Sequence, residues 1–213
     1  MGVLQGLAAF EDELEDSGGK TRYFKPDSGS TVKVWFLDDL AEGTPAVDAG
    51  AGLATMISQH QAGKNYMRRA QCTKKDEGRC YGCEQALAHP QTGWGVSKRV
   101  YVNVLVDDGK SDPYVAVWNI ATKRSAVWPL LKEAYIDDGT IADAPWRVRR
   151  IGEGTDTTFT LKKLSGEPAD FGSYNRFDLT EIVTYVPYDE QEEHYNKTFE
   201  SSKPDNDDDD AGW

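Results

Sequence analysis

Three cysteines are clustered between positions 72 and 83, and the last two, Cys80 and Cys83, form a Cys-x2-Cys knuckle. At this spacing two thiolates can turn back onto a single metal ion. Three cysteines are an odd number and lie too close together in sequence for a disulfide framework. Charged residues surround them, which argues against ordinary buried thiols. The cluster therefore predicts a metal site in a reducing compartment, with Cys72 as the third sulfur ligand.

A fourth ligand is needed, and two of the three histidines lie near the cysteines in sequence. A hairpin over residues 57 to 72 would bring His60 beside Cys72, whereas His89 would have to reach back from a segment that begins like a helix at Glu84. We therefore favour His60 and keep His89 as the alternative. Four protein ligands complete the tetrahedron that Zn²⁺ prefers and leave no position for water, so the predicted zinc site is structural.

Zinc-dependent base deaminases are the enzymes to compare with this pattern. Their chemistry uses a His-x-Glu motif and a Pro-Cys-x-x-Cys motif. Here Gln61 and Ala62 follow His60, and Arg79 stands before Cys80. Neither motif is present, so we predict a protein without catalytic activity and without a small-molecule substrate.

The elements that would carry these residues are mostly strands. Segments with alternating or β-branched and aromatic residues lie at 31–37, 100–106, 114–118, 146–151 and 157–164, and the last two form a predicted hairpin. Residues 125–135 have apolar residues at helical spacing. Five strands with one helix before the last pair indicate a mainly β fold of the oligonucleotide-binding (OB) type, a five-stranded Greek-key barrel with a few short helices, although sandwiches share such counts.

Length and composition favour one core with extensions. A chain of 213 residues can bury one substantial core, but only 38% of its residues are hydrophobic and its net charge is -12. We expect a mobile acidic arm at 1–20, a core at 21–188 that includes a zinc-binding insertion at about 57–92, and a disordered acidic tail at 189–213. Because no apolar run could span a bilayer and no secretion signal is present, we expect a cytoplasmic protein that does not bind membranes.

Charge is distributed unevenly along the chain. Residues 189–213 hold ten carboxylates and two lysines, so they contribute -8 and the remaining 188 residues only -4. Residues 60–99 hold eight basic and three acidic residues, a local balance of +5. Net acidity therefore does not exclude nucleic acid as a partner, because a basic groove can exist in an acidic protein.

Basic and aromatic residues occur together on the predicted strands. Proteins that hold single-stranded DNA without sequence preference combine a basic groove for phosphates with rings on which bases stack. If Val100 and Val102 face the core, the alternate residues Arg99 and Tyr101 face outward. The candidate DNA-binding residues are Lys33, Trp35, Arg68, Arg69, Lys98, Arg99, Tyr101, Trp118, Lys123 and Arg124.

The tail combines a run of aspartates with a terminal aromatic residue. Such a run can occupy a basic groove when DNA is absent, and a terminal hydrophobic residue offers other proteins an anchor. A role in solubility is the alternative. The residues expected to bind partner proteins are Asp207, Asp208, Asp209, Asp210 and Trp213.

The order of these motifs resembles that of the helix-destabilising single-stranded DNA-binding proteins of T-even bacteriophages. The pattern His60-x11-Cys72-x7-Cys80-x2-Cys83 is similar to that family's His-Cys-Cys-Cys zinc insertion, with slightly shorter spacings. The similarity continues over roughly residues 21 to 185. It includes Val34-Trp35-Phe36-Leu37, Tyr101-Val102-Asn103-Val104-Leu105-Val106, the Trp118 strand, Phe159-Thr160-Leu161-Lys162 and Asp178-Leu179-Thr180-Glu181-Ile182.

The resemblance implies an OB-fold with one structural zinc ion, and single-stranded DNA binding in phage replication, recombination and repair within the bacterial host cytoplasm. The acidic residues at 11 to 16 do not match the family's basic arm, so cooperative binding is not implied. The tail resembles the acidic tails of bacterial and T-odd phage single-stranded DNA-binding proteins, which implies replication or recombination proteins as partners. A zinc-stabilised protein-interaction adaptor or an RNA-binding protein is the competing interpretation.

Overall fold

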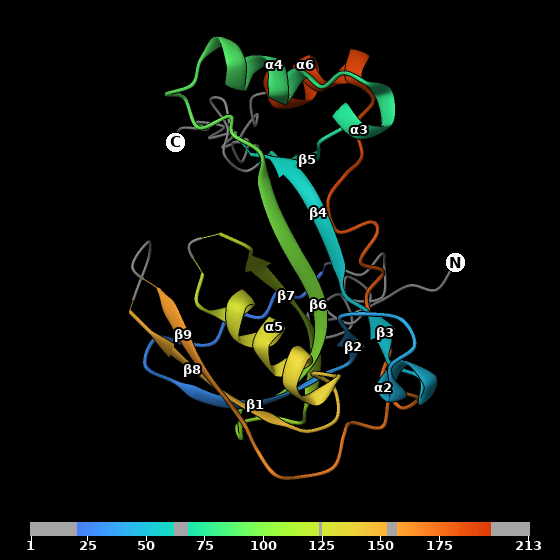
Figure 1. Cartoon of the computed structure of the whole chain (residues 1–213). Helices are drawn as coiled ribbons and strands as arrows, with labels where there is room; N and C mark the ends of the chain where they lie inside the picture. Colours follow the sequence, from blue (N-terminus) through green and yellow to red (C-terminus); the bar gives the residue numbers. More distant parts are fainter. Residues whose placement is uncertain (1–20, 62–67, 124, 153–156, 197–213) are drawn as a thin grey trace, which may run out of the picture. The chain divides into compact units, whose positions relative to one another are not determined.

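The structure, a computed structural model, describes residues 21–61, 68–123, 125–152 and 157–196 (Figure 1). The chain divides into two compact units. The first, the sheet unit, comprises Met1–Gln59 and Ser97–Thr184. The second, the cysteine unit, comprises His60–Val96 and Tyr185–Trp213. The second unit holds most of the range predicted for the zinc-binding insertion, about 57–92, together with residues 185–196.

Both units are built from short elements. In the sheet unit they are β1 (Thr31–Phe36), β2 (Asp38–Asp39), α2 (Pro45–Asp48), β3 (Gly52–Leu53), β4 (Thr55–His60, whose last residue belongs to the cysteine unit), β6 (Ser97–Asp107), β7 (Tyr114–Ala121), α5 (Val127–Asp138), β8 (Trp146–Ile151) and β9 (Thr158–Lys163). The cysteine unit contains β5 (Ala70–Gln71), α3 (Lys74–Glu77), α4 (Tyr81–Ala88) and α6 (Tyr188–Asn196). The mainly β fold with a few short helices is confirmed, and each predicted strand segment and the helix at 125–135 has its counterpart. The predictions for residues 1–20 and for Arg124, Asp207, Asp208, Asp209, Asp210 and Trp213 lie outside the described residues.

The long strand β6 organises the sheet. On one edge it pairs with β7 from Arg99 to Val106. That stretch overlaps the residues of β6 that pair with β4 and with β1, so β4 and β1 share the opposite edge. Beyond β1 follow β8 and then β9, and all these pairs are antiparallel. The order is thus β7, β6, β1, β8, β9, with α5 between β7 and β8 along the chain.

The sheet is antiparallel, but a closed barrel is not found among the described residues. β7 and β9 share no hydrogen-bonded ladder there. Instead, residues 22–24 form backbone hydrogen bonds with the free edge of β7. The Phe24 N–H donates to the Val117 carbonyl at 2.9 Å, and the Val117 N–H donates to the Arg22 carbonyl at 2.8 Å.

The core lies on the inner face of this sheet, where aromatic rings pack together. Phe36 stacks on Trp118 at 6.1 Å between ring centroids and meets the edge of Trp146 at 5.8 Å. Phe24 approaches Trp118 to 4.8 Å, and α5 adds the fully buried Leu131. Burying one large apolar side chain stabilises a fold by about 1.5–3 kcal/mol, so this cluster is the main stabilising element of the sheet unit.

Strand β6 is buried on both faces over its middle, from Val100 to Val106. One face packs into the core described above. The other face, which carries Tyr101, is covered by the segment that contains Leu179 and Val183. Alternation along β6 was predicted correctly, but the second face is a small core instead of a solvent-exposed surface.

Candidate metal centre and basic surface

The four predicted metal ligands come together in the cysteine unit. The ligand atoms of His60, Cys72, Cys80 and Cys83 all lie within 4.8 Å of one another. Cys83 Sγ is 3.5 Å from His60 Nε2 and 3.6 Å from Cys72 Sγ. In a zinc tetrahedron with usual bond lengths, sulfurs lie about 3.8 Å apart and sulfur and nitrogen about 3.5 Å. The group therefore has the size of a tetrahedral metal site, and His89, at the C-terminal cap of α4, is not part of it.

Short turns bring the cysteines to one point. Cys72 directly follows β5, and the single turn of α3 ends at Gly78. Gly78 has φ 75°, a left-handed conformation that a residue without a β-carbon adopts readily. The chain reverses there, so that Cys80 caps the N-terminus of α4 and Cys83 lies in its first turn.

Gly82, inside the knuckle, leaves room for the histidine ring. A β-carbon on Gly82 would lie 2.4 Å from Cγ of His60 and 2.6 Å from its Cδ2. Carbon atoms in contact are normally about 3.5–4.0 Å apart. The His60 ring thus packs directly against the backbone of α4, and any side chain at position 82 would displace it.

His60 is oriented from behind by a backbone group. Its side chain is fully buried, and Nδ1 lies 2.7 Å from the carbonyl oxygen of Trp94. Because a carbonyl can only accept, Nδ1–H is the donor, and the Nε2 lone pair faces the sulfurs. Burial lowers the pKa of His60, which keeps the imidazole in the neutral form that binds metals.

The thiols lie so close together that negative charge on one sulfur opposes ionisation of another. Burial alone would raise the pKa of Cys80, but the nearby backbone N–H groups of Cys83 and Thr73 bring it below its usual value. Burial, the Cys72 thiol and negative charge on Cys80 raise the pKa of Cys83 to about 12. Three thiolates this close together require a cation, which a divalent metal supplies.

A buried glutamine from α6 lies behind the cysteines. Gln191 Nε2 donates to Thr73 Oγ1 at 3.0 Å and to the Val186 carbonyl at 2.8 Å. Its Oε1 accepts from the Tyr81 N–H at 2.9 Å and lies 3.5 Å from Cys80 Sγ. Both hydrogens of the amide and its oxygen are therefore used, although no sequence pattern singles out this residue.

Helix α6 corrects the predicted boundary of the acidic tail. Residues 189–213 were expected to be disordered, yet 188–196 form a helix with Gln191 and Tyr195 buried. The Tyr195 ring meets Trp94 edge-on at 4.9 Å and stacks on Tyr81 at 6.3 Å. The acidic composition concealed these two buried positions, which are four residues apart and so lie on one helix face.

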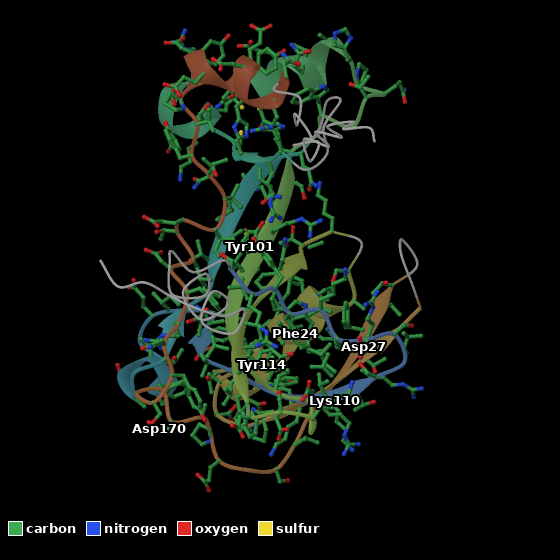
Figure 2. The ribbon with its side chains drawn as sticks, turned by 180° about the vertical axis from the view of Figure 1, so that it is seen from behind. Phe24, Asp27, Tyr101, Lys110, Tyr114 and Asp170 are labelled. Carbon is green, nitrogen blue, oxygen red and sulfur yellow. The ribbon has the colours of Figure 1, made fainter. Side chains whose placement is uncertain are left out.

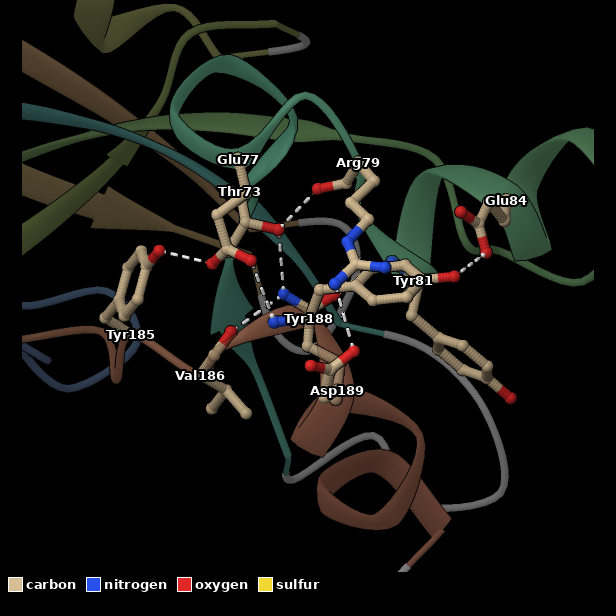
Figure 3. A network of polar contacts seen from close by, with 10 residues as sticks. Thr73, Glu77, Arg79, Tyr81, Glu84, Tyr185, Val186, Tyr188 and Asp189 are labelled. Atoms are coloured by element: carbon tan, nitrogen blue, oxygen red, sulfur yellow. Dashed lines mark hydrogen bonds and ion pairs between the residues drawn. The ribbon is translucent and has the colours of Figure 1, made fainter.

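Charged and polar side chains join the same segments at the surface (Figure 3). Arg79 pairs with Asp189 at 3.1 Å, and its guanidinium lies 4.2 Å from the Tyr188 ring centre. The Tyr188 hydroxyl donates to Glu84 at 2.8 Å. Tyr185 donates to Glu77 in the same way. The chain from Tyr185 onward thus contacts α3, the turn after it and α4.

Comparisons with protein families, curated proteins and solved structures found no match to this chain. The metal centre therefore rests on its own geometry, which consists of four compact ligands, an imidazole held by Trp94, and three free thiols. In the part of the chain that the structure describes, no helix combines the length and apolar character that crossing a membrane requires.

Two of the predicted DNA-binding rings are buried, which corrects the sequence-based interpretation. Tyr101, labelled on β6 in Figure 2, has no exposed surface, and its hydroxyl donates to Gln59 Oε1 at 2.6 Å. Trp118 is 3% exposed and belongs to the aromatic core. Neither ring can stack on a base, because Leu179 and Val183 cover the face that carries Tyr101 and the main core encloses Trp118.

The remaining candidates lie at separate places. Arg99 donates to Asn119 Oδ1 at 3.0 Å and lines a cavity of about 180 Å³ that also borders Phe159. Lys98 and Lys123 are exposed. The half-buried Arg68 and Arg69 belong to the cysteine unit.

Lys33 and Trp35 lie on the outer face of β1, and the sheet places further basic residues beside them. Lys33 Nζ is 4.2 Å from the centre of the Trp35 ring, whose Nε1 donates to the Glu167 carbonyl at 3.2 Å. Lys33 is paired with Arg147 on β8, and Arg147 with Lys162 on β9. Three positive charges therefore lie in a row across adjacent strands.

This set, which we call the basic row, consists of Lys33, Arg147 and Lys162. Arg149 lies two residues further along β8 on the same face. None of the four forms an ion pair with a carboxylate among the described residues. Asp107, which pairs with Lys33 from β6, is the acidic neighbour. Sequence reasoning missed the two arginines and Lys162, although Arg147 and Arg149 alternate with the buried Trp146 and Val148.

Proposed function

We propose that this protein binds single-stranded DNA without sequence preference and without catalysis. The observation that carries the proposal is the basic row. Like charges directly opposite one another on neighbouring strands destabilise a sheet, so sheet stability does not account for Lys33, Arg147 and Lys162 lying side by side. A polyanion across the three strands does account for it, because each phosphate would neutralise a charge.

The row has the dimensions and the aromatic neighbour that a nucleic-acid strand needs. Strands lie about 4.8 Å apart, so the three basic residues extend over about 10 Å across the sheet. Trp35 is half-buried and held in place, with Lys33 beside it. A ring next to aligned cations is the combination that sequence-tolerant single-strand binders use.

We further propose that the metal is zinc and that its role is structural. Three thiolates and one imidazole form a donor set that zinc prefers, and four protein ligands leave no open position for a reacting water. His60, Cys72, Cys80 and Cys83 would hold the ion. Its contribution would be to stabilise the fold of the cysteine unit.

The order of the strands supports an OB-type interpretation of the sheet unit. Three antiparallel neighbours (β1, β6, β7), a helix, and then β8 and β9 on the other side of β1 follow the Greek-key connectivity expected of that barrel. Together with the His60-to-Cys83 pattern this connectivity is in line with the T-even phage resemblance. We therefore propose a role in phage DNA replication, recombination and repair, with the acidic tail, from Asp207 to Trp213, as the attachment point for partner proteins.

Binding of labelled oligonucleotides tests the proposal. The full chain is titrated into oligo-dT, duplex DNA of equal length and oligo-U at several salt concentrations, and the anisotropy is recorded. We expect tight binding to oligo-dT, weaker binding to the duplex, and an affinity that falls as salt rises. If oligo-U binds as tightly as oligo-dT, the protein is better described as an RNA-binding protein. If none of the three nucleic acids binds, the alternative of a zinc-stabilised protein-interaction adaptor is favoured.

Single charge reversals locate the binding surface. Arg147→Glu or Lys162→Glu should reduce the dependence of log affinity on log salt by about 0.7, the contribution of one phosphate contact on a single strand. Lys132→Glu, on the exposed surface of α5, makes the same charge change away from the row and should have a smaller effect. If all three variants lose affinity equally, the basic row is not the binding surface, even though the protein binds DNA.

A further inference from the structure

We infer that Gln191 is a positioning residue of the metal centre and that docking of α6 is thermodynamically coupled to metal binding. The inference rests on the proposed zinc site. It goes beyond it because it assigns a role to a helix that supplies no ligand. The binding of one ion would then control whether α6 stays packed on the rest of the cysteine unit.

Gln191 bridges the residues that directly follow two ligands. Thr73 comes after Cys72, and Tyr81 comes after Cys80. The Gln191 amide donates to the Thr73 hydroxyl at 3.0 Å and accepts from the Tyr81 N–H at 2.9 Å. One planar group therefore sets the distance between the two chain segments that carry these sulfurs. The Thr73 hydroxyl donates in turn to the Arg79 carbonyl at 2.8 Å, which extends the same connection toward the knuckle.

The same helix also supports the histidine ligand. Tyr195 meets the Trp94 ring edge-on at 4.9 Å, and the Trp94 carbonyl accepts from His60 Nδ1. Displacing α6 would remove the aromatic neighbour of the residue that orients the imidazole. Through Gln191 and Tyr195, α6 thus contacts neighbours of three of the four ligands. Groups that orient metal ligands from behind typically change metal affinity 10- to 100-fold when they are lost.

Helix α6 has little stability of its own. It is nine residues long, and isolated helices of this length are marginal in water. It also carries four carboxylates, at Asp189, Glu190, Glu192 and Glu193, which repel one another. Its folded state therefore depends on the surface that Thr73, Tyr81 and Trp94 present, and the metal holds that surface together. Coupling of this kind is reciprocal, so if docked α6 tightens metal binding, bound metal must stabilise docking by the same factor.

Zinc affinity and hydrogen exchange, measured on the full chain, test the two directions of the coupling. Zinc is competed against a chromophoric chelator in the unaltered chain, in Gln191→Ala and in Gln191→Glu. We expect Gln191→Ala to lose 10- to 100-fold in affinity. Gln191→Glu keeps the acceptor for the Tyr81 N–H but replaces the N–H donors to Thr73 and Val186 by a carboxylate oxygen. It should therefore lose at least as much zinc affinity as Gln191→Ala. Glu192→Ala, an exposed neighbour on the same helix, serves as the control and should not lose zinc affinity, because it touches no ligand and only relieves repulsion between carboxylates.

The effect of zinc on the docking of α6 is measured by hydrogen exchange of the backbone amides of residues 188–196 in the unaltered chain. Removing zinc should accelerate their exchange at least tenfold while β6 and β7 keep their protection. If zinc leaves and exchange in α6 does not change, the coupling is overturned, and unchanged zinc affinity in Gln191→Ala overturns the positioning role. A chain that binds no zinc at all refutes the zinc proposal itself, which is a different result from zinc bound without any effect on α6.

Discussion

Replacing Gly82 by alanine sets two opposing effects against each other. Alanine is favoured over glycine inside a helix by about 1 kcal/mol, so helix propensity predicts that Gly82→Ala stabilises α4. The new β-carbon, however, would lie 2.4 Å from Cγ of His60 and 2.9 Å from its Nδ1. The ring must therefore move by about 1 Å or more to restore normal contact distances.

The displacement of His60 should outweigh the gain in helix propensity. Overpacking a tight site costs about 1–3 kcal/mol, and losing the 2.7 Å hydrogen bond from Nδ1 to the Trp94 carbonyl costs about 1 kcal/mol more. After subtracting the propensity gain, we expect a net destabilisation of about 1–3 kcal/mol. Moving Nε2 away from Cys83 Sγ should also weaken zinc binding at least tenfold.

Thermal unfolding and zinc competition measure the two quantities. Gly95→Ala is the matched control, because a β-carbon at Gly95, in the same unit, has no atom within 4 Å. It should leave zinc affinity unchanged. If Gly82→Ala binds zinc as tightly as the unaltered chain and unfolds at the same or a higher temperature, then His60 does not pack on the knuckle in the way described and the reasoning fails.

Four further predictions concern the charges, the metal ligands and the core. Arg147→Glu should stabilise the fold by up to about 1 kcal/mol in denaturant unfolding, because it removes like-charge contacts with Lys33 and Lys162. The same variant should weaken single-stranded DNA binding. A destabilised variant would show that these charges do not repel one another. Zinc affinity should rise at least tenfold per pH unit near neutrality, since zinc must displace a proton from Cys83, whose pKa is raised to about 12, and any proton held by the other two thiols adds to the slope. A pH-independent affinity would show that Cys83 is not a ligand. The stability of the metal-free cysteine unit in acid depends on His60, whose pKa is lower in the folded than in the unfolded chain. The unfolded chain therefore binds the proton first, and the unit should lose stability as pH falls below about 6.5. Trp118→Ala should cost about 3–5 kcal/mol of unfolding free energy, because this residue is core; loss of DNA binding at unchanged stability would restore it as a contact residue.

The metal ligands and the strands were predictable because their signals are local. A Cys-x2-Cys knuckle constrains the chain over four residues, and alternating residues such as Val32 and Val34 reveal a strand without reference to anything distant. The structure contains the cysteine cluster and the strands as predicted, because neither pattern depends on which distant segments of the chain come into contact.

The missed features depend on distant partners. Tyr101 alternates correctly with Val100 and Val102, but only the fold shows that Leu179 covers its face. The basic row exists only once the register aligns Lys33 with Arg147 and Lys162. Helix α6 was not predicted, because its nine residues are rich in carboxylates and their composition is that of a solvated tail. Only the contacts of Gln191 and Tyr195 in the folded chain show that one face of the helix is buried.

The pairing of residues 22–24 with β7 bears on self-association. An exposed strand edge offers unpaired N–H and C=O groups to a second chain and is a common origin of aggregation. Here the Arg22 carbonyl accepts from the Val117 N–H and the Phe24 N–H donates to the Val117 carbonyl, while the Phe24 ring packs on Trp118. A shortened protein starting at Lys25 would expose both the edge and a hydrophobic surface beside it. By occupying the free groups of Val117, residues 22–24 would hinder edge-to-edge pairing of β7 with a second chain, and we expect a protein that lacks them to self-associate more readily.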